Sequence, residues 1–490
     1  MNNILKYILL SVQFCLLSQL LQAGDKPNIL FLFTDDQSYN TVHALGNPDI
    51  ITPNLDRLVN EGTSFTNTYN MGSWTGAVCV ASRTMMNTGL SVWRANAIDD
   101  KKRLEAIQDK GQTWPQLLQS AGYETYMAGK WHVKLDTHKI FNNVRNVRPG
   151  MPNDFPEGYG RPVEGQPDKW SPYDPKFEGF WKGGKHWSEV LADDAELFLE
   201  QAAKSDKPFF MYLAFNAPHD PRQAPKAFVD MYPLEKMKVP ASFQPSYPYK
   251  QEIGCFMMEK KGEWVPQRDE NLAPHPRTEY AVKVNLQEYY ACVSHLDAQI
   301  GRILAALEKT GKLDNTYIFM SADHGLACGS HGLLGKQNMY EHSMKPPLIV
   351  VGPSVPKGQQ REAFVYLQDI MASTLDLAGL EKPAYVEFNS LMPLVKDPGA
   401  PSNYDVLYGC FREDLQRMIR VGDHKLLVYP AAKVVRLFNV KKDPLELEDL
   451  AGNPENRGLV KRLFKRLVKL QAEMEDPLDL AKGFPDLAAK

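Results

Sequence analysis

The sequence predicts an α/β protein built on a large, mostly parallel sheet sandwiched by helices, with a smaller α+β domain at the C-terminus. Short continuous apolar runs, typical of strands buried on both faces, occupy residues 27–34, 123–128, 208–215, 317–322 and 347–351. Apolar residues at helical spacing lie between them, most clearly over residues 289–307, with Gly311 beyond the end. Strands that alternate with helices indicate a parallel sheet, which binds ligands at the carboxyl ends of its strands.

Two long segments interrupt this alternation. Residues 138–187 and 232–278 are rich in Pro and aromatic residues, and irregular segments of that length usually have a functional reason. We expect both to wall a substrate cleft. After Pro401 the pattern changes to four short β-like pieces and a helix over about residues 459–474. We therefore predict a large domain at residues 24–399 and a subdomain with a small antiparallel sheet and a helix at residues 400–490.

The first 23 residues have the pattern of a signal peptide. Lys6 precedes a mostly apolar stretch over residues 7–21, and Leu21-Gln22-Ala23 offers a small-residue cleavage site. The apolar stretch is too short for a confident membrane span, and polar residues follow it at once. We expect an exported soluble protein, periplasmic or secreted, with no membrane attachment after signal cleavage.

Composition narrows the class of partner. The net charge is only −3 over 490 residues, so nothing in it points to nucleic acid, and an anionic substrate needs a few local cations. The mature chain keeps an odd number of cysteines at spacings that match no zinc or disulfide framework. We expect buried free thiols for most of these cysteines, which are Cys79, Cys255, Cys292, Cys328 and Cys410.

Acidic residues follow two of the predicted strands. Asp35 and Asp36 end the first run, and Asp323 and His324 follow the run at 317–322. Adjacent carboxylates repel each other and need a cation, and hard oxygen ligands suit Ca²⁺ or Mg²⁺. Helix N-caps are the structural alternative for such aspartates. Two acidic sites at the same edge of one sheet favour a shared metal ion.

A cysteine lies in a setting that suits no apolar core. Cys79-Val80-Ala81-Ser82-Arg83 is followed by Asn87-Thr88-Gly89. If a helix begins here, Arg83 lies one turn beyond Cys79 on the same face. Its guanidinium could then stabilise a charged or strongly hydrogen-bonded group at position 79.

Three further motifs carry Lys and His, two of them directly after strand-like runs. Gly129-Lys130-Trp131-His132 follows the run at 123–128, and Lys130 and His132 point the same way if the chain stays extended. Ala217-Pro218-His219-Asp220-Pro221 follows the run at 208–215, and its prolines make the loop rigid. The third motif spans residues 331–341 and contains Lys336.

These motifs, in this order, resemble those of the type I sulfatases of the alkaline phosphatase superfamily, and most of all bacterial carbohydrate sulfatases similar to iduronate-2-sulfatase. The cysteine-to-arginine segment matches except that Ala81 replaces the usual proline, and the GKWH, APHxP and HGLxGKxxxYE motifs follow. The resemblance covers essentially all of the mature chain. It implies an alkaline-phosphatase-like fold, with a sulfatase catalytic domain at residues 24–399.

The resemblance also implies a cofactor, a modification and residue roles. A formylglycine-generating maturase would oxidise Cys79 to formylglycine, whose hydrate attacks sulfur while Asp323 takes the proton of the metal-activated hydroxyl. His219 would protonate the leaving oxygen, and His132 would then help to expel sulfate. The implied ligands of one Ca²⁺ are Asp35, Asp36, Cys79, Asp323 and His324, and the implied catalytic residues are Cys79, Arg83, Lys130, His132, His219 and Lys336.

We therefore predict a sulfatase that acts on a sulfated sugar or glycan, and three alternatives stay open. A phosphatase or phosphodiesterase of the same superfamily would share the fold, although such enzymes use Ser or Thr and usually two zinc ions. A sulfated-glycan binding protein whose cysteine is never converted stays open because of Ala81. Transfer of sulfate to an acceptor other than water is the third alternative.

Overall fold

The computed structural model describes residues 26–152, 155–258 and 262–489. Its main sheet has eight strands in the order β11-β2-β10-β9-β1-β6-β4-β5. The predicted signal peptide at residues 1–23 lies outside the described residues. Among the residues described, no helix is both long and apolar enough to cross a membrane. The strands are β1 (Asn28–Thr34), β2 (Thr63–Tyr69), β4 (Glu124–Lys130), β5 (Asn143–Arg148), β6 (Phe209–Ala214), β9 (Thr316–Ala322), β10 (Leu348–Val351) and β11 (Gln359–Tyr366).

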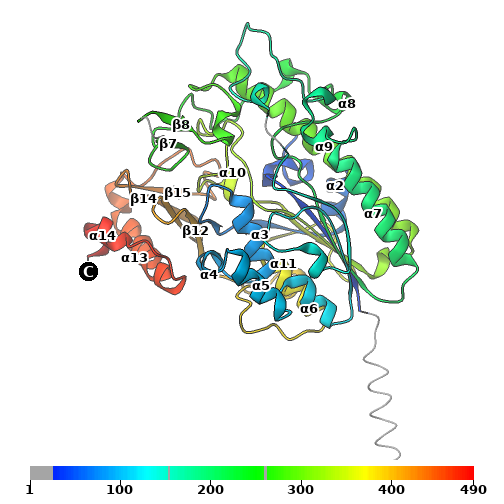
Figure 1. Cartoon of the computed structure of the whole chain (residues 1–490). Coiled ribbons are helices and arrows are strands. Elements are labelled where there is room, and N and C mark those ends of the chain that lie inside the picture. Colours follow the sequence, from blue (N-terminus) through cyan, green and yellow to red (C-terminus); the bar gives the residue numbers. More distant parts are fainter. Residues whose placement is uncertain (1–25, 153–154, 259–261, 490) are drawn as a thin grey trace, which may run out of the picture.

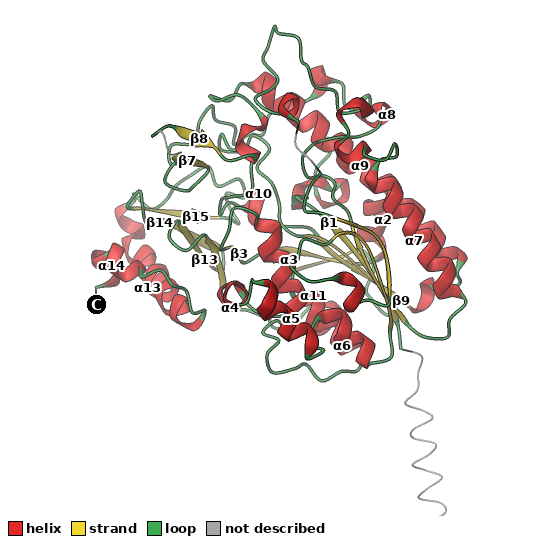
Figure 2. Cartoon of the chain, viewed as in Figure 1, coloured by secondary structure: helices red, strands yellow, loops and turns green. Residues whose placement is uncertain are grey.

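Helices cover both faces of this sheet (Figures 1 and 2). Both faces of the sheet are apolar and need cover, as the central strand β1 shows. Its residues alternate between two apolar cores: Phe31 and Phe33 face one, and Leu30 and Leu32 face the other. One face carries α2 (Pro53–Glu61), α7 (Trp187–Ala203) and α9 (Glu279–Lys309), and the other carries α3 (Val78–Thr88), α6 (Trp114–Ser120) and α11 (Asp369–Leu377). The predicted α/β sandwich is confirmed.

The C-terminal part forms a second, smaller sheet in the order β15-β14-β13-β12-β3. Strands β12 (Leu407–Phe411), β13 (Gln416–Val421), β14 (His424–Tyr429) and β15 (Val434–Asn439) are antiparallel to one another, and α13 (Arg457–Glu473) packs on them. Strand β3 (Gly72–Ser73) comes from the large domain and pairs with β12 in parallel. Gly72 has a φ of +92°, and a side chain there would collide with the carbonyl of Cys410. The small sheet is thereby joined to the segment that leads into α3.

Short helices and a hairpin complete the fold. The hairpin pairs β7 (Phe256–Met258) with β8 (Trp264–Pro266). The remaining helices are α4 (Val92–Ala97), α5 (Lys101–Asp109), α8 (Lys226–Val229), α10 (Glu341–Met344), α12 (Met392–Lys396), α14 (Leu480–Gly483) and α15 (Pro485–Ala488).

Two sequence predictions need correction, and one strand runs against the others of the mostly parallel sheet. Strand β10 is antiparallel to β9, because residues 323–347 contain only the short α10 and no helix that carries the chain back across the sheet. Segment 138–187 is not wholly irregular, since it contains the partly exposed edge strand β5, which pairs with β4. Helix α9 begins ten residues before the predicted start, where the Thr278 side chain accepts a hydrogen bond from the Ala281 N–H.

Candidate active site

The carboxyl ends of β1 and β9 bring the predicted acidic residues together. The two strands are parallel neighbours, so Asp35 and Asp36 lie beside Asp323 and His324. The Asp36 N–H donates to Asp323 Oδ1 at 3.1 Å, and all these side chains are buried. Neither Asp35 nor Asp36 caps a helix, because Ser38 occupies the N-cap of the next helical turn. The helix-cap alternative is therefore wrong.

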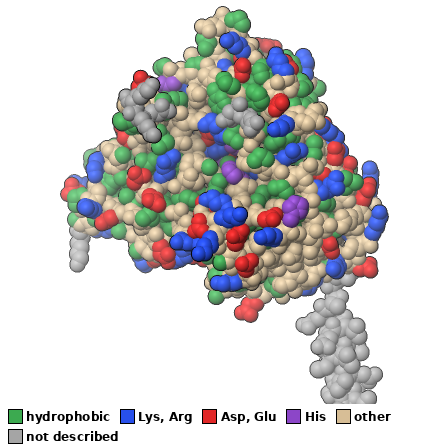
Figure 3. All heavy atoms as spheres, in the orientation of Figure 1, with side chains coloured by type: hydrophobic (Ala, Val, Ile, Leu, Met, Phe, Trp, Pro, Cys, Tyr) green, Lys and Arg blue, Asp and Glu red, His purple; other side chains and the backbone are tan. Residues whose placement is uncertain are grey.

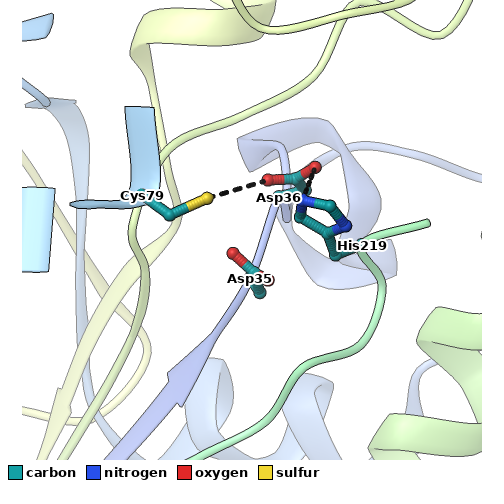
Figure 4. Close-up of side chains that lie close together, drawn as sticks. All are labelled: Asp35, Asp36, Cys79 and His219. Atoms are coloured by element: carbon teal, nitrogen blue, oxygen red, sulfur yellow. Dashed lines mark hydrogen bonds and ion pairs between the residues drawn. The ribbon is translucent and has the colours of Figure 1, made fainter. Parts of the chain in front are cut away.

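Cys79 enters this acidic group from the first turn of α3. Its Sγ lies 3.4 Å from His324 Nε2, 3.7 Å from Lys336 Nζ and 4.0 Å from Asp36 Oδ1. Figure 4 shows Cys79 and His219 facing Asp36, with Asp35 at the end of β1 beside them. The N-terminal end of a helix favours negative charge on such a thiol.

Arg83 follows one turn later on α3, as predicted, and is fully buried. Its Nε donates to Asp323 Oδ2 at 3.1 Å, and its Nη1 donates to the Lys130 carbonyl at 2.9 Å. The hydrogen bonds of Arg83 thus go to Asp323 and Lys130, with none to Cys79. Its Nη2 lies 3.8 Å from Asp35 Oδ1, and within the described residues neither atom has a hydrogen bond.

Lys130 and His132 reach the site by different routes. Lys130 is the last residue of β4 and its Nζ donates to Asp35. His132 has a φ of +59°, so the chain does not stay extended here and the condition for the two side chains to point the same way is not met. The imidazole still lines the site, because Gly150 packs so close to it that any side chain there would collide with the ring. Burial lowers the pKa of His132.

Lys336 and His219 approach the acidic group at Asp36. Lys336 Nζ donates to both oxygens of Asp36 at 2.8 Å. His219 Nδ1 lies 2.7 Å from the Asp220 carbonyl oxygen, and its Nε2 lies 3.8 Å from Asp36 Oδ2. Every predicted site residue therefore belongs to one cluster, in which all but the half-buried His132 are buried.

Sequence reasoning missed Arg268 and Asp269, which also line the site. Arg268 Nη2 lies 3.1 Å from His219 Nε2, and Asp269 Oδ2 lies 3.7 Å from Lys336 Nζ. They come from segment 232–278, where no motif marks them. The only signal was the prediction that this segment walls a cleft. Residues from it and from segment 138–187 do line one cavity of about 440 Å³, with Cys79, His132, His219 and Lys336 in its wall.

The electrostatics of the cluster are set by the thiol and its neighbours. Burial alone would raise the pKa of Cys79, but the charges of Lys130, Lys336 and His324 lower it well below its usual value. Burial opposes the charged form of His324, yet Asp323 and Asp36 raise its pKa to about 9. Burial likewise raises the pKa of Asp35, and the nearby Asp323 and Cys79 raise it further. A cation bound between these carboxylates would relieve that repulsion.

The donor set fits one hard metal ion. Asp35, Asp36, Cys79 and His219 offer ligand atoms within 4.8 Å of one another, and so do Asp35, Cys79, Asp323 and His324. The buried Asp35 Oδ1, which lacks a hydrogen bond among the described residues, is a free oxygen ligand. Carboxylate oxygens of this kind suit calcium. The remaining cysteines are free and buried, as expected.

Comparison with known proteins agrees with this geometry. The family described as Sulfatase matches residues 27–380. The chain belongs to the sulfatase family. A second family, described as N-sulphoglucosamine sulphohydrolase, C-terminal, matches residues 329–473, which include strands β12 to β15 of the small sheet. The protein is therefore a sulfuric ester hydrolase.

Individual sulfatases are similar over nearly the whole chain. An N-acetylglucosamine-6-O-sulfatase of Bacteroides thetaiotaomicron is 28% identical over 92% of this chain and 87% of its own length. An arylsulfatase of Clostridium perfringens is 28% identical over 94% of this chain and 98% of its own length. The present structure is also similar to the solved structure of a protein bound to its substrate, D-glucosamine-2-N,6-O-disulfate. The TM-score is 0.70 and the sequence identity 25%, and the match covers 92% of this chain and 99% of the other protein.

Proposed function

We propose that this sulfatase hydrolyses sulfate esters of a sugar or glycan after export, with formylglycine at position 79 and one bound Ca²⁺. The observation that carries the proposal is the position of Cys79. It lies on α3 in the wall of a 440 Å³ cavity and is surrounded by Lys336, His132 and two strand-end carboxylates.

Fixed cations would hold the sulfate group. Lys336 lines the cavity, while Arg83 and Lys130 lie behind the carboxylates. A sulfate ester carries one negative charge spread over three oxygens, so a few buried donors can bind it without a basic surface. On the face that Figure 3 shows, Lys and Arg are intermixed with Asp and Glu. In other enzymes, removal of one such preorganised donor costs roughly 2.7–4 kcal/mol of transition-state stabilisation.

The two histidines have separate tasks in this proposal. His219 donates a proton from Nε2 to the leaving oxygen, and the Asp220 carbonyl at 2.7 Å from Nδ1 fixes the orientation of the ring. His132, whose lowered pKa favours the neutral imidazole, takes a proton from residue 79. Both rings line the same cavity as Cys79, so each can reach the reacting group.

The metal and the modification supply what these side chains lack. Calcium held by Asp35, Asp36, Asp323, His324 and residue 79 would add positive charge beside the sulfate oxygens. Oxidation of the Cys79 thiol to formylglycine would supply an oxygen nucleophile. We therefore include a formylglycine-generating maturase among the partners of the chain, and an export signal at residues 1–23 as its route out of the cytoplasm.

A desulfation screen tests the substrate class. The panel consists of defined sulfated monosaccharides, among them N-acetylglucosamine 6-sulfate, together with 4-nitrophenyl sulfate and 4-nitrophenyl phosphate. We expect turnover of at least one sugar sulfate above that of the phosphate. Efficient hydrolysis of the phosphate alone would favour the phosphatase alternative, and binding of sulfated sugars without turnover would favour a glycan-binding protein.

A further inference from the structure

We propose that Arg268 determines specificity for the leaving sugar by binding the uncharged hydroxyl nearest the sulfate ester. This inference rests on the proposed function and assigns a residue outside the sequence motifs. Arg268 lines the same cavity as Cys79 and is about one-third exposed.

The position of Arg268 places it beside the leaving oxygen. Its Nη2 lies 3.1 Å from His219 Nε2, the atom that we assign to protonate that oxygen. An oxygen that is hydrogen-bonded to His219 Nε2 therefore lies next to the guanidinium. The nearest free hydroxyl of a sugar lies about one hydrogen-bond length from its ester oxygen, so Arg268 can reach it.

One edge of the guanidinium is fixed and another is available. Asp269 Oδ1 accepts hydrogen bonds from Arg268 Nε and Nη2 at 3.2 and 2.8 Å, and Asp220 Oδ1 accepts from Nη2 at 3.3 Å. Among the described residues, no hydrogen bond engages Nη1. Since the guanidinium is planar and rigid, the two ion pairs set the direction in which the Nη1 donors point.

The same ion pairs decide which kind of substituent Arg268 can bind. Two carboxylates offset its charge, and Asp269 also accepts a hydrogen bond from Gln337 Nε2 at 2.7 Å. Asp220 also contacts His219 and Asp269 also contacts Lys336, so the charge of Arg268 is offset in part. The guanidinium is therefore a weaker site for a second sulfate or a carboxylate than an unpaired arginine would be. Gln267 also lines the cavity, and an amide group suits a neutral hydroxyl.

A buried anchor holds this wall against the sulfate-binding loop. The Glu270 carboxylate accepts hydrogen bonds from the N–H groups of Leu334 and Gly335, and it pairs with Arg277 at 2.6 Å. Leu334 and Gly335 directly precede Lys336. Arg268 is thus fixed relative to the lysine that binds sulfate, as a specificity residue must be.

A substrate-by-mutation cycle tests the assignment. The probes are the best sugar sulfate of the panel, its analogue that lacks the hydroxyl nearest the ester, and 4-nitrophenyl sulfate. Arg268→Ala should lower kcat/KM on the sugar sulfate by about 10- to 100-fold, the usual effect of losing a hydrogen bond to a charged group. The same variant should change kcat/KM on the deoxy analogue and on 4-nitrophenyl sulfate by less than about threefold.

Arg302→Ala is the matched control, because Arg302 also pairs with two carboxylates, Asp193 and Glu196, but lies on the outer part of α9. It should leave kcat/KM unchanged on all three probes. The wild-type protein gives an independent measurement, in which the deoxy analogue should be turned over about 10- to 100-fold less well than the parent sugar.

Three outcomes overturn the assignment. One is an equal loss by Arg268→Ala on all three probes, which would indicate a structural role. The second is a larger loss on sugars with a second sulfate or a carboxylate beside the ester, and the third is equal wild-type turnover of the deoxy analogue. If the wild-type protein hydrolyses 4-nitrophenyl sulfate but no sugar sulfate, the proposed function fails and this inference fails with it.

Discussion

Two buried clusters of charged side chains flank the segment at residues 331–341, and they differ in how well their charges are matched. At its C-terminal end Glu341 pairs with Lys425 at 2.9 Å, Lys345 at 3.3 Å and Arg420 at 3.5 Å, and Lys425 also pairs with Glu446 at 2.8 Å. We call these five residues the junction cluster. It joins the large domain to the small sheet, because Arg420 and Lys425 belong to β13 and β14.

The active-site cluster, on the other side of Lys336, is matched less completely. Asp35 Oδ1 and Arg83 Nη2 lie 3.8 Å apart, and neither has a hydrogen bond in the described part of the chain. Within the same residues Glu446 Oε1 of the junction cluster also lacks a hydrogen bond, but it lies only 2.8 Å from the cation Lys425. Buried polar groups are normally satisfied, so such exceptions call for a ligand. The segment at residues 331–341 thus contributes to both clusters: Lys336 contacts Asp36 in the active site, and Glu341 pairs with Lys425 of the small sheet.

The largest effect should come from residue 79. Cys79→Ala should lower kcat by about a millionfold, as loss of a nucleophile does in other hydrolases. The thermal midpoint should not fall, because alanine fits the first turn of α3 and leaves the junction cluster intact. Steady-state kinetics measure kcat, and a thermal melt measures the thermal midpoint. Retention of even a hundredth of wild-type turnover would contradict the role of residue 79 as the nucleophile.

Metal removal should have the next largest effect. Chelation should abolish turnover and lower the thermal midpoint, since Asp35, Asp36 and Asp323 would lose their shared cation. Calcium should restore activity better than zinc, and a crystal structure should show one ion with ligand distances of ~2.3–2.6 Å. Better rescue by zinc, or two ions in the site, would favour the phosphatase alternative.

Removal of the proposed acid should depend on the leaving group. His219→Ala should lower kcat on a sugar sulfate by about 10²- to 10⁴-fold, the usual contribution of general acid catalysis. On 4-nitrophenyl sulfate the loss should be much smaller, because that phenolate leaves without a proton. Equal losses on both substrates would refute the acid role of His219 but not the sulfatase activity.

The smallest effect on chemistry should come from the junction cluster. Lys425→Met leaves Glu341 and Glu446 without their shared cation, and breaking such a buried pair should lower the free energy of unfolding by about 3–5 kcal/mol. The kcat of the protein that remains folded should not change. Denaturant titration measures the free energy of unfolding, and Lys465→Met, at an exposed position, is the control. A large loss of kcat without loss of stability would show that the two clusters are not separate.

Sequence patterns predicted the elements that carry strong apolar periodicity and missed the others. Strand β1 is a continuous apolar run and was found, whereas β2 and β11 contain many polar residues and β5 is a half-exposed edge strand. An apolar run also carries no information about direction, so the antiparallel orientation of β10 could not be predicted from its residues. Direction depends on the connection between strands rather than on the strand itself.

The active-site residues also fall into two groups, those whose position the sequence predicted and those whose position it did not. Asp35, Asp36, Asp323 and Lys130 lie at or just after strand ends, so the topology of a parallel sheet predicted that they meet. The partners of Arg83 could not be predicted, because helical spacing gives a face of α3 but not the carboxylates opposite it. Arg268 was missed because its position depends on the tertiary contact between Glu270 and the loop before Lys336.

The most direct test of the account is the mass of the peptide that contains position 79, measured in protein preparations of known activity. We expect formylglycine at this position, and we expect turnover per molecule to rise in proportion to the modified fraction, with none at zero modification. Fully active protein in which Cys79 is wholly unmodified would contradict the central claim.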